Sequence, residues 1–211
     1  MKRTLSLLLV MVVLSPKLSF SQLYIEPFAG YQRSQNSSNY NMLNTGVQVA
    51  FKLKVYEILG QVQRGWPQTF NGVDEAFTTN TFLPLSMPAQ KTITTSAFTF
   101  AIGHRLKLFG KKTKNSFFLK LYTGLMSQNN VVKYQYDKTN YVILNPDKTI
   151  DRTGLFISGG FEYMRSLKNG RLFIDLNFSS PPIGSVKYPI SYHLMSPVTL
   201  NVGYSIKISK K

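Results

Sequence analysis

Ionisable residues on the polar faces of alternating segments are the part of this sequence that could do chemistry. They comprise four acids and three bases: Glu26, Glu57, Glu162, Asp175, Arg105, Lys120 and Arg171. If these faces enclose a narrow space, the charges must pair, because an unpaired buried charge is costly. We therefore predict a ladder of interior ion pairs. The alternative is a charged constriction that selects permeating ions.

Catalytic and ligand-binding motifs are sparse. The only histidines are His104 and His193. His193 is close to Ser196 in sequence, but such a pair occurs often by chance. The chain has no phosphate loop, paired-acid motif or metal-ligand spacing. We expect no catalytic residue, no cofactor and no metal site.

The elements that must position the charges are segments with a hydrophobic period of two, which is typical of β-strands. Eight such runs span Leu23–Gln32, Gly46–Leu53, Val55–Arg64, Phe98–Lys107, Phe117–Met126, Leu155–Tyr163, Arg171–Phe178 and Val198–Ile208. Each is about ten residues long, the length of a tilted membrane-crossing strand. A soluble sandwich also alternates, but small and ionisable residues together suit a narrow, filled lumen. We predict an all-β fold: an eight-stranded antiparallel up-and-down transmembrane β-barrel, with ten strands as the alternative.

The connections alternate in length. Short ones cover residues 52–54, 109–115 and 167–170, the last with Asn169-Gly170 as a hairpin signal; long ones cover 33–45, 65–95, 127–153 and 179–197. This pattern is typical of periplasmic turns and extracellular loops, and an even strand count puts both termini in the periplasm.

The third long connection contains two β-prone arms, 131–136 and 141–144, around a turn at 137–140. We expect them to project beyond the membrane as a hairpin that continues strands five and six. The residues that define this hairpin are Val131, Val132, Tyr134, Tyr136, Tyr141 and Ile143.

The first 21 residues resemble a secretory signal. Lys2 and Arg3 precede the apolar run 5–14, and Ser19-Phe20-Ser21 offers a small-x-small cleavage site. We expect residues 1–21 to be a signal peptide and 22–211 the barrel domain; an N-terminal membrane anchor is the alternative. The chain has no cysteine, which excludes a disulfide scaffold.

The formal net charge of +16 would by itself suggest a nucleic-acid binder, but an exported protein rarely meets nucleic acid. Much of the excess falls near the predicted periplasmic end and forms a basic collar. Its members are Lys52, Lys54, Lys107, Lys111, Lys112, Lys114, Lys168, Lys207, Lys210 and Lys211. The collar could contact anionic headgroups, at about 1 kcal/mol for each base, or a periplasmic partner, or form a solvated rim.

Three motifs carry a family resemblance: the opening strand Tyr24–Tyr31, the strand Gly159–Tyr163 and the closing strand Leu200–Tyr204. With these motifs, nearly the whole mature chain resembles the "porin family" of outer-membrane β-barrel domain proteins common in Bacteroidetes. One departure is that the closing strand runs through Ile206 and Ile208 into Ser209-Lys210-Lys211, where such barrels usually end on an aromatic residue. The resemblance implies an outer-membrane location in a Gram-negative bacterium, with outer-membrane lipids and the assembly machinery as partners. The expected hairpin is similar to that of the OmpX-type subgroup, which implies binding of foreign surfaces by β-augmentation.

Four functions are compatible with the sequence. The first is a non-enzymatic barrel with a plugged lumen, whose outer loops bind a surface, ligand or protein partner. The second is a narrow pore for small solutes. The third is a lipid-modifying outer-membrane enzyme, because barrel enzymes that trim or acylate lipid A exist. The fourth is a soluble periplasmic barrel that binds a lipid-like ligand.

Overall fold

The computed structural model describes residues 22–34, 41–53, 56–78, 80–110, 114–144, 148–180 and 197–208. The strands are β1 (Gln22–Ser34), β2 (Asn41–Lys52), β3 (Tyr56–Thr78), β4 (Ser86–Phe109), β5 (Asn115–Gln135), β6 (Tyr141–Val142), β7 (Lys148–Ser166), β8 (Gly170–Ser179) and β9 (Pro197–Ile208). The expected signal peptide and His193 lie outside the described residues.

No helix in the described ranges is long and apolar enough to cross a membrane.

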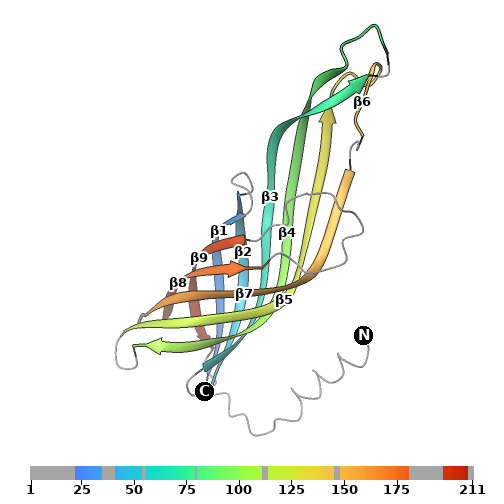
Figure 1. Cartoon of the computed structure of the whole chain (residues 1–211). Helices are drawn as coiled ribbons and strands as arrows, with labels where there is room; N and C mark the ends of the chain where they lie inside the picture. The colour runs from blue at the N-terminus through green and yellow to red at the C-terminus, as the bar shows by residue number, and fades with distance from the viewer. Residues whose placement is uncertain are drawn as a thin grey trace, which may run out of the picture.

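The strands form a closed antiparallel ring. Neighbours pair in the order β2-β1-β9-β8-β7-β5-β4-β3, and β3 pairs with β2 to close the ring. The ring therefore has eight strands, as the sequence predicts, and the alternative of a ten-stranded barrel is wrong. The ninth strand, β6, has two residues and pairs with the far end of β3. Figure 1 shows β6 beside the end of β3, well away from the barrel.

Apolar side chains cover the outside of the barrel because alternate residues of each strand face outward. We call this surface the apolar belt: Ile25, Val47, Val62, Phe98, Phe100, Ile102, Leu121, Leu125, Leu155, Ile157, Phe161, Ile174, Leu176, Val202 and Ile206, all exposed. Every strand of the ring contributes to it. Monomeric soluble proteins rarely expose so much contiguous apolar surface, so the belt needs an apolar surrounding.

Strands β3 and β4 are much longer than predicted. They remain paired from Gly65 and Ala97 as far as Phe77 and Ser86, through a segment expected to be a loop. The loop was predicted from the prolines and polar residues of the segment, and this prediction is wrong. Pro67 is accommodated at a β-bulge, in which β3 advances from Gly65 to Gln68 while β4 advances from Ala97 to Thr95.

The predicted hairpin between 131–136 and 141–144 is also wrong in its pairing. Strand β5 does continue to Gln135, but Val131 pairs with Thr94 of β4 and Thr149 of β7. Tyr141 and Val142 pair with β3 instead. The projecting feature is therefore a sheet of four long strands. Figure 1 shows β3, β4, β5 and β7 rising beyond β1, β2, β8 and β9.

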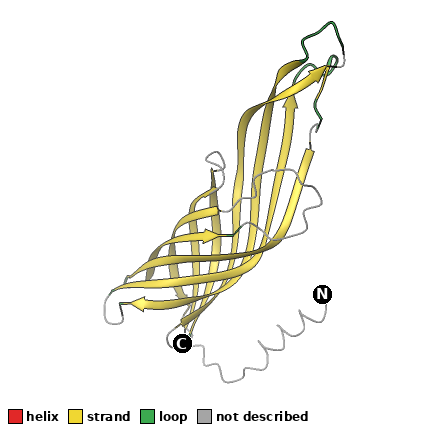
Figure 2. Cartoon of the chain, in the orientation of Figure 1, coloured by secondary structure: helices red, strands yellow, loops and turns green. Residues whose placement is uncertain are grey.

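The projecting part has the opposite hydrophobic pattern to the barrel. We call it the outer sheet: residues 66–78, 86–96, 127–135 and 148–154. Apart from Val73 and Trp66 its outward face is mostly polar, with Thr69 hydrogen-bonded to Thr94 and Asn129 to Asp151. Its inward face carries an outer core, comprising Ala76, Ala89, Val132, Tyr134, Tyr141 and Ile143. In the barrel the polar residues face inward, beside buried apolar clusters around Tyr122 and Phe173, and the outward face is apolar. Above the belt the outward face becomes mostly polar and the inward face apolar. Figure 2 shows the strands running without interruption from the barrel into this sheet.

Candidate functional site

Arg105 occupies the centre of the barrel interior and is completely buried. Strand β4 points it inward because Ile102, His104 and Leu106 on alternate positions face out. Its guanidinium donates to Glu26 at 3.0 Å and to Glu162 at 2.6 Å, and also pairs with Glu57. These carboxylates come from β1, β7 and β3, so one side chain links opposite walls of the lumen. Arginine suits this role because its planar fork can bind several carboxylates at once.

Lys120 extends the cluster on the other side of Glu162. Its ammonium lies 3.0 Å from Glu162 and also pairs with Asp175 of β8. Asp175 accepts further hydrogen bonds from the amides of Asn177 and Asn201, each at 2.9 Å. These donors use the remaining lone pairs of a carboxylate held away from bulk water.

Arg171 completes the cluster toward the short turns. It donates to Glu57 and Glu26, each at 2.9 Å, and its guanidinium lies 3.7 Å from the centre of the Tyr24 ring. The structure thus joins all seven ionisable residues singled out from the sequence in one charge network.

The charge network draws on the whole ring. Six strands supply its charged residues, while β2 contributes Gln48, which donates to Glu26, and β9 contributes Ser205, which bonds Arg171. The four acids outnumber the three bases, and neutral amide donors stabilise the extra negative charge. A cross-section held on all sides in this way has little freedom to open, because moving one charge would leave another unpaired.

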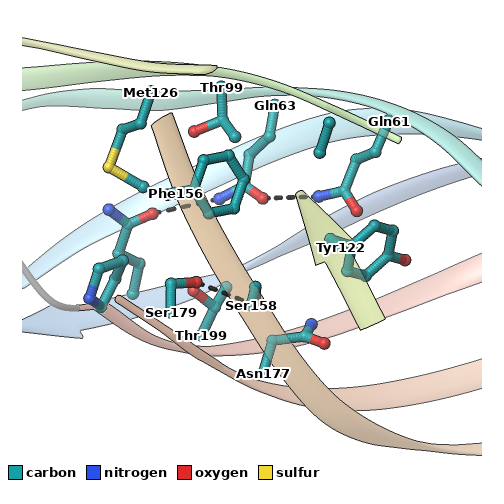
Figure 3. A pocket seen from close by; sticks show the side chains of 13 residues that line it. Gln61, Gln63, Thr99, Tyr122, Met126, Phe156, Ser158, Asn177, Ser179 and Thr199 are labelled. Atoms are coloured by element: carbon teal, nitrogen blue, oxygen red, sulfur yellow. Dashed lines mark hydrogen bonds between the residues drawn. The ribbon is translucent and has the colours of Figure 1, made fainter. Parts of the chain in front are cut away.

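A small pocket lies on the other side of the network, toward the outer sheet. Gln61, Gln63, Thr99, Ser158 and Thr199 are among the residues that line it, with Tyr122 at its wall (Figure 3). Gln63 accepts from Gln61 at 2.9 Å and donates to Gln32 at 3.1 Å. The volume is about 30 Å³, which holds about one water molecule. Met126 and Phe156 also line the pocket, which is therefore mixed in character and too small for an organic ligand.

Basic side chains of the collar surround the opposite mouth. Lys52 and Lys107 line a pocket of about 150 Å³ together with Arg171 and Glu57. Lys114, Lys168 and Lys207 are exposed at the same end. Lys54, Lys111, Lys112, Lys210 and Lys211 lie outside the described residues. The hairpin turn at 167–170 is closed by a hydrogen bond from the Leu167 amide to the Gly170 carbonyl.

The residues of the expected hairpin serve the outer core instead. Val132, Tyr134, Tyr141 and Ile143 are buried in it, and Tyr136 packs against it. Val131 is half-buried on the other face of the same sheet.

At the edge of the outer core, Asp74 accepts from Lys91 and from the Tyr134 hydroxyl, both at 3.1 Å. Partial burial raises the pKa of Asp74, but these hydrogen bonds outweigh it and hold that pKa below its usual range.

His104 faces outward on the belt, with its ring edge-on to Tyr56 at a centroid distance of 6.3 Å. Within the described residues, no group of three His, Cys, Asp or Glu side chains could hold a metal ion.

Sequence reasoning missed two groups of residues. Gln48, Asn177 and Asn201 lie within three of the predicted runs, but their bonds to the acids were not predicted. Sequence reasoning also missed Ala76 and Ala89 of the outer core. Ala76 and Ala89 lie in a segment interpreted as a loop, where no alternation was expected, although Asp74, Ala76 and Phe77 of β3 already show one inward and one outward face.

No protein-family model and no curated protein sequence matches the chain. Among solved structures, it is similar to a major outer membrane protein from Thermus thermophilus, with a TM-score of 0.52 and 11% identity over 89% of this chain and 99% of that one. The attachment invasion locus protein Ail of Yersinia pestis, in complex with a heparin analogue, gives a TM-score of 0.45 and 10% identity over 89% and 97% of the chains. At such low identities a likeness bears on the fold alone. The likeness to the Thermus thermophilus protein, together with the closed eight-stranded ring and the apolar belt, shows that the chain has the fold of the small outer-membrane β-barrel proteins.

Proposed function

We propose that the chain is a non-enzymatic outer-membrane protein whose lumen is plugged and whose outer sheet makes contacts outside the cell. The observation that carries this proposal is the combination of an apolar outside with a lumen crossed by the charge network. A soluble barrel that carries a lipid needs the reverse arrangement, with an apolar interior and a polar outside.

The height of the apolar belt supports membrane anchoring. On β4 its outward apolar residues run from Phe98 to Leu108. Ten residue steps correspond to about 33 Å along the strand, and at the usual tilt to about 25 Å across the bilayer. Above Phe98 the outward residues are Ser96 and Thr94, so the belt ends sharply.

The orientation follows from the two ends of the barrel. The short turns with the basic collar would lie in the periplasm, near anionic headgroups, and residues 1–21 would direct export. The outer sheet would then project from the cell. Its outward polar face and inward core suit a part of the protein that stands in water.

Cell fractionation tests the anchoring. We expect the chain in the outer-membrane fraction, with a gel mobility that changes on heating, because folded barrels migrate differently from unfolded ones. Release of the chain in a salt-washed periplasmic fraction would contradict the proposal.

Conductance in planar bilayers tests the plug. We expect no steady open pore from the wild-type protein, and measurable openings from Arg105→Ser combined with Lys120→Ser. The matched control is Arg165→Ser with Lys168→Ser, two exposed bases outside the network, which should stay closed. A steady pore in the wild type would favour the narrow-pore function instead.

A further inference from the structure

Five apolar side chains gather at the far end of the outer sheet. We call them the apolar tip: Phe77, Phe82, Leu85, Val142 and Leu144. Phe77 pairs with Val142 across β3 and β6, and the Thr78 amide bonds the Leu85 carbonyl, so these segments meet at one place. Phe82 is 95% exposed, Leu144 86% and Leu85 83%. Elsewhere on the outer sheet the large apolar side chains that are exposed are Val73 and Trp66, which stand among polar neighbours, so five together at this end are an unusual concentration.

The apolar tip carries no charge. Residues 76–90 and 139–144 contain no acidic or basic side chain, although Glu75 and Lys91 border the first range and Lys138 the second. Burying a charge in a medium of low dielectric constant is costly. The part of the sheet that reaches furthest is thus compatible with such a medium, while the part behind it is not.

The backbone of the tip turn is hydrogen-bonded within the protein. The Leu83 amide donates to the Asn80 carbonyl at 3.2 Å, and the Phe82 amide donates to the Asn80 side chain at 3.0 Å. The Thr78 hydroxyl accepts from the Asn80 amide at 3.0 Å and donates to the Asn140 carbonyl at 2.8 Å. Backbone groups that enter lipid need such internal partners, because lipid offers none.

The turn is also held in place from below. Leu83 packs on the outer core, so Phe82 and Leu85 on either side of it point away. The tip stands about 33 Å along the strand beyond the end of the belt, counted from Ser96 to Ser86. It therefore cannot reach the bilayer that holds the barrel.

We propose that the apolar tip inserts into the interfacial region of a second lipid bilayer, opposite the membrane that anchors the barrel. The proposal rests on the proposed anchoring and deepens it by naming the target of the outer sheet as a lipid surface. The interaction depends on apolar burial and does not need anionic lipid, because the tip has no base to attract it.

Binding to vesicles tests this proposal. The full chain is placed in lipid nanodiscs and floated with protein-free phosphatidylcholine vesicles, with Phe82→Ser plus Leu85→Ser as the test variant. We expect the double variant to lower the vesicle partition coefficient about a hundredfold, because two large side chains then stay in water. The control is Gln90→Ser with Gln135→Ser, a pair exposed on the outward face of the same sheet, which should bind like the wild type.

The depth to which the apolar tip enters the vesicle bilayer is measured with a fluorescent side chain. In a Trp66→Phe background, Phe82→Trp should shift to shorter wavelength on vesicle addition and be quenched by brominated lipid. Unchanged fluorescence would contradict insertion, as would equal binding of the Phe82→Ser, Leu85→Ser variant.

Binding only to vesicles with anionic lipid would overturn the proposal too. Pairing of loaded nanodiscs with one another but not with empty nanodiscs, lost in the tip variant, would make a second copy the partner and also overturn it. A heat-dependent gel shift in every variant shows that the barrel is intact. Its absence in the wild type would instead contradict the proposed anchoring.

Discussion

At the scale of single residues, Arg105 has the most demanding position. It is one of three bases among four acids, is completely buried, and contacts three of those acids directly. Removing one charge from such a cluster is costly, since its former partners stay buried without an opposite charge.

Replacing Arg105 by Met should lower the free energy of unfolding by about 3–5 kcal/mol, because three buried carboxylates lose their common partner. Urea unfolding in lipid vesicles, followed by the gel shift, measures the change. Arg165→Met, at an exposed base on β7, should change it by no more than about 0.5 kcal/mol. Equal effects of the two substitutions would contradict a special role for the network.

Asp74 gives the outer sheet a dependence on pH. Its pKa is lowered in the folded protein, so its contribution to stability is complete above the unfolded pKa and disappears as the pH falls through the folded pKa. Hydrogen-exchange protection of β4 near Lys91 should therefore hold from pH 7 to about 5 and weaken below about 4.

In Asp74→Asn this part of the pH dependence should vanish. Asp151→Asn, on the outward face, serves as the control and should keep it. An unchanged profile in Asp74→Asn would assign the effect to another group.

At the scale of elements, the outer sheet is a unit with a core of its own. Its strands are the continuations of four barrel strands. Val132 and Ala89 are nevertheless buried by contacts made entirely beyond the belt. The barrel and the outer sheet can therefore differ in local stability.

Val132→Asp should disrupt the outer sheet and leave the barrel folded. Placing a carboxylate in the outer core should cost about 3 kcal/mol or more. Limited proteolysis should then cut between residues 80 and 145, while the heat-dependent gel shift persists. Lys133→Asp changes the exposed neighbour and should leave the sheet resistant; equal cleavage of both variants would contradict the assigned faces.

The sequence predicts the barrel better than the outer sheet, and the reason is physical. Within the belt, lipid outside and charges inside impose a strict alternation, which makes residues such as Phe100 and Arg105 easy to assign. Above it the alternation reverses and one bulge changes the phase of β3, so no single pattern covers a whole strand. The pairing of Val142 with Phe77 joins segments 65 residues apart, and no local pattern reveals such a contact.

At the scale of the whole molecule, the two edges of the belt define three zones: a basic end at the short turns, an apolar band and a projecting sheet. The band is the zone that must match the membrane, so substitutions on the outward face should depend on height.

Phe100→Arg, within the band, should lower the free energy of unfolding by about 2–4 kcal/mol, whereas Thr94→Arg, six residues further on the same outward face, should cost about 1 kcal/mol or less. Urea titrations of the protein folded in vesicles compare the two. A larger cost at Thr94 would place the membrane boundary higher than the belt indicates.

The bulge at Trp66 and Pro67 also constrains how this chain can change over evolution. Because side chains alternate along a strand, the one added residue exchanges the inward and outward faces for all later residues of β3. Losing either residue would turn Asp74 and Ala76 toward the outside and Glu75 toward the outer core. Viable insertions and deletions in β3 beyond Gln68 should therefore come in even numbers, whereas the turn from Asn80 to Leu85 can change length without that restriction.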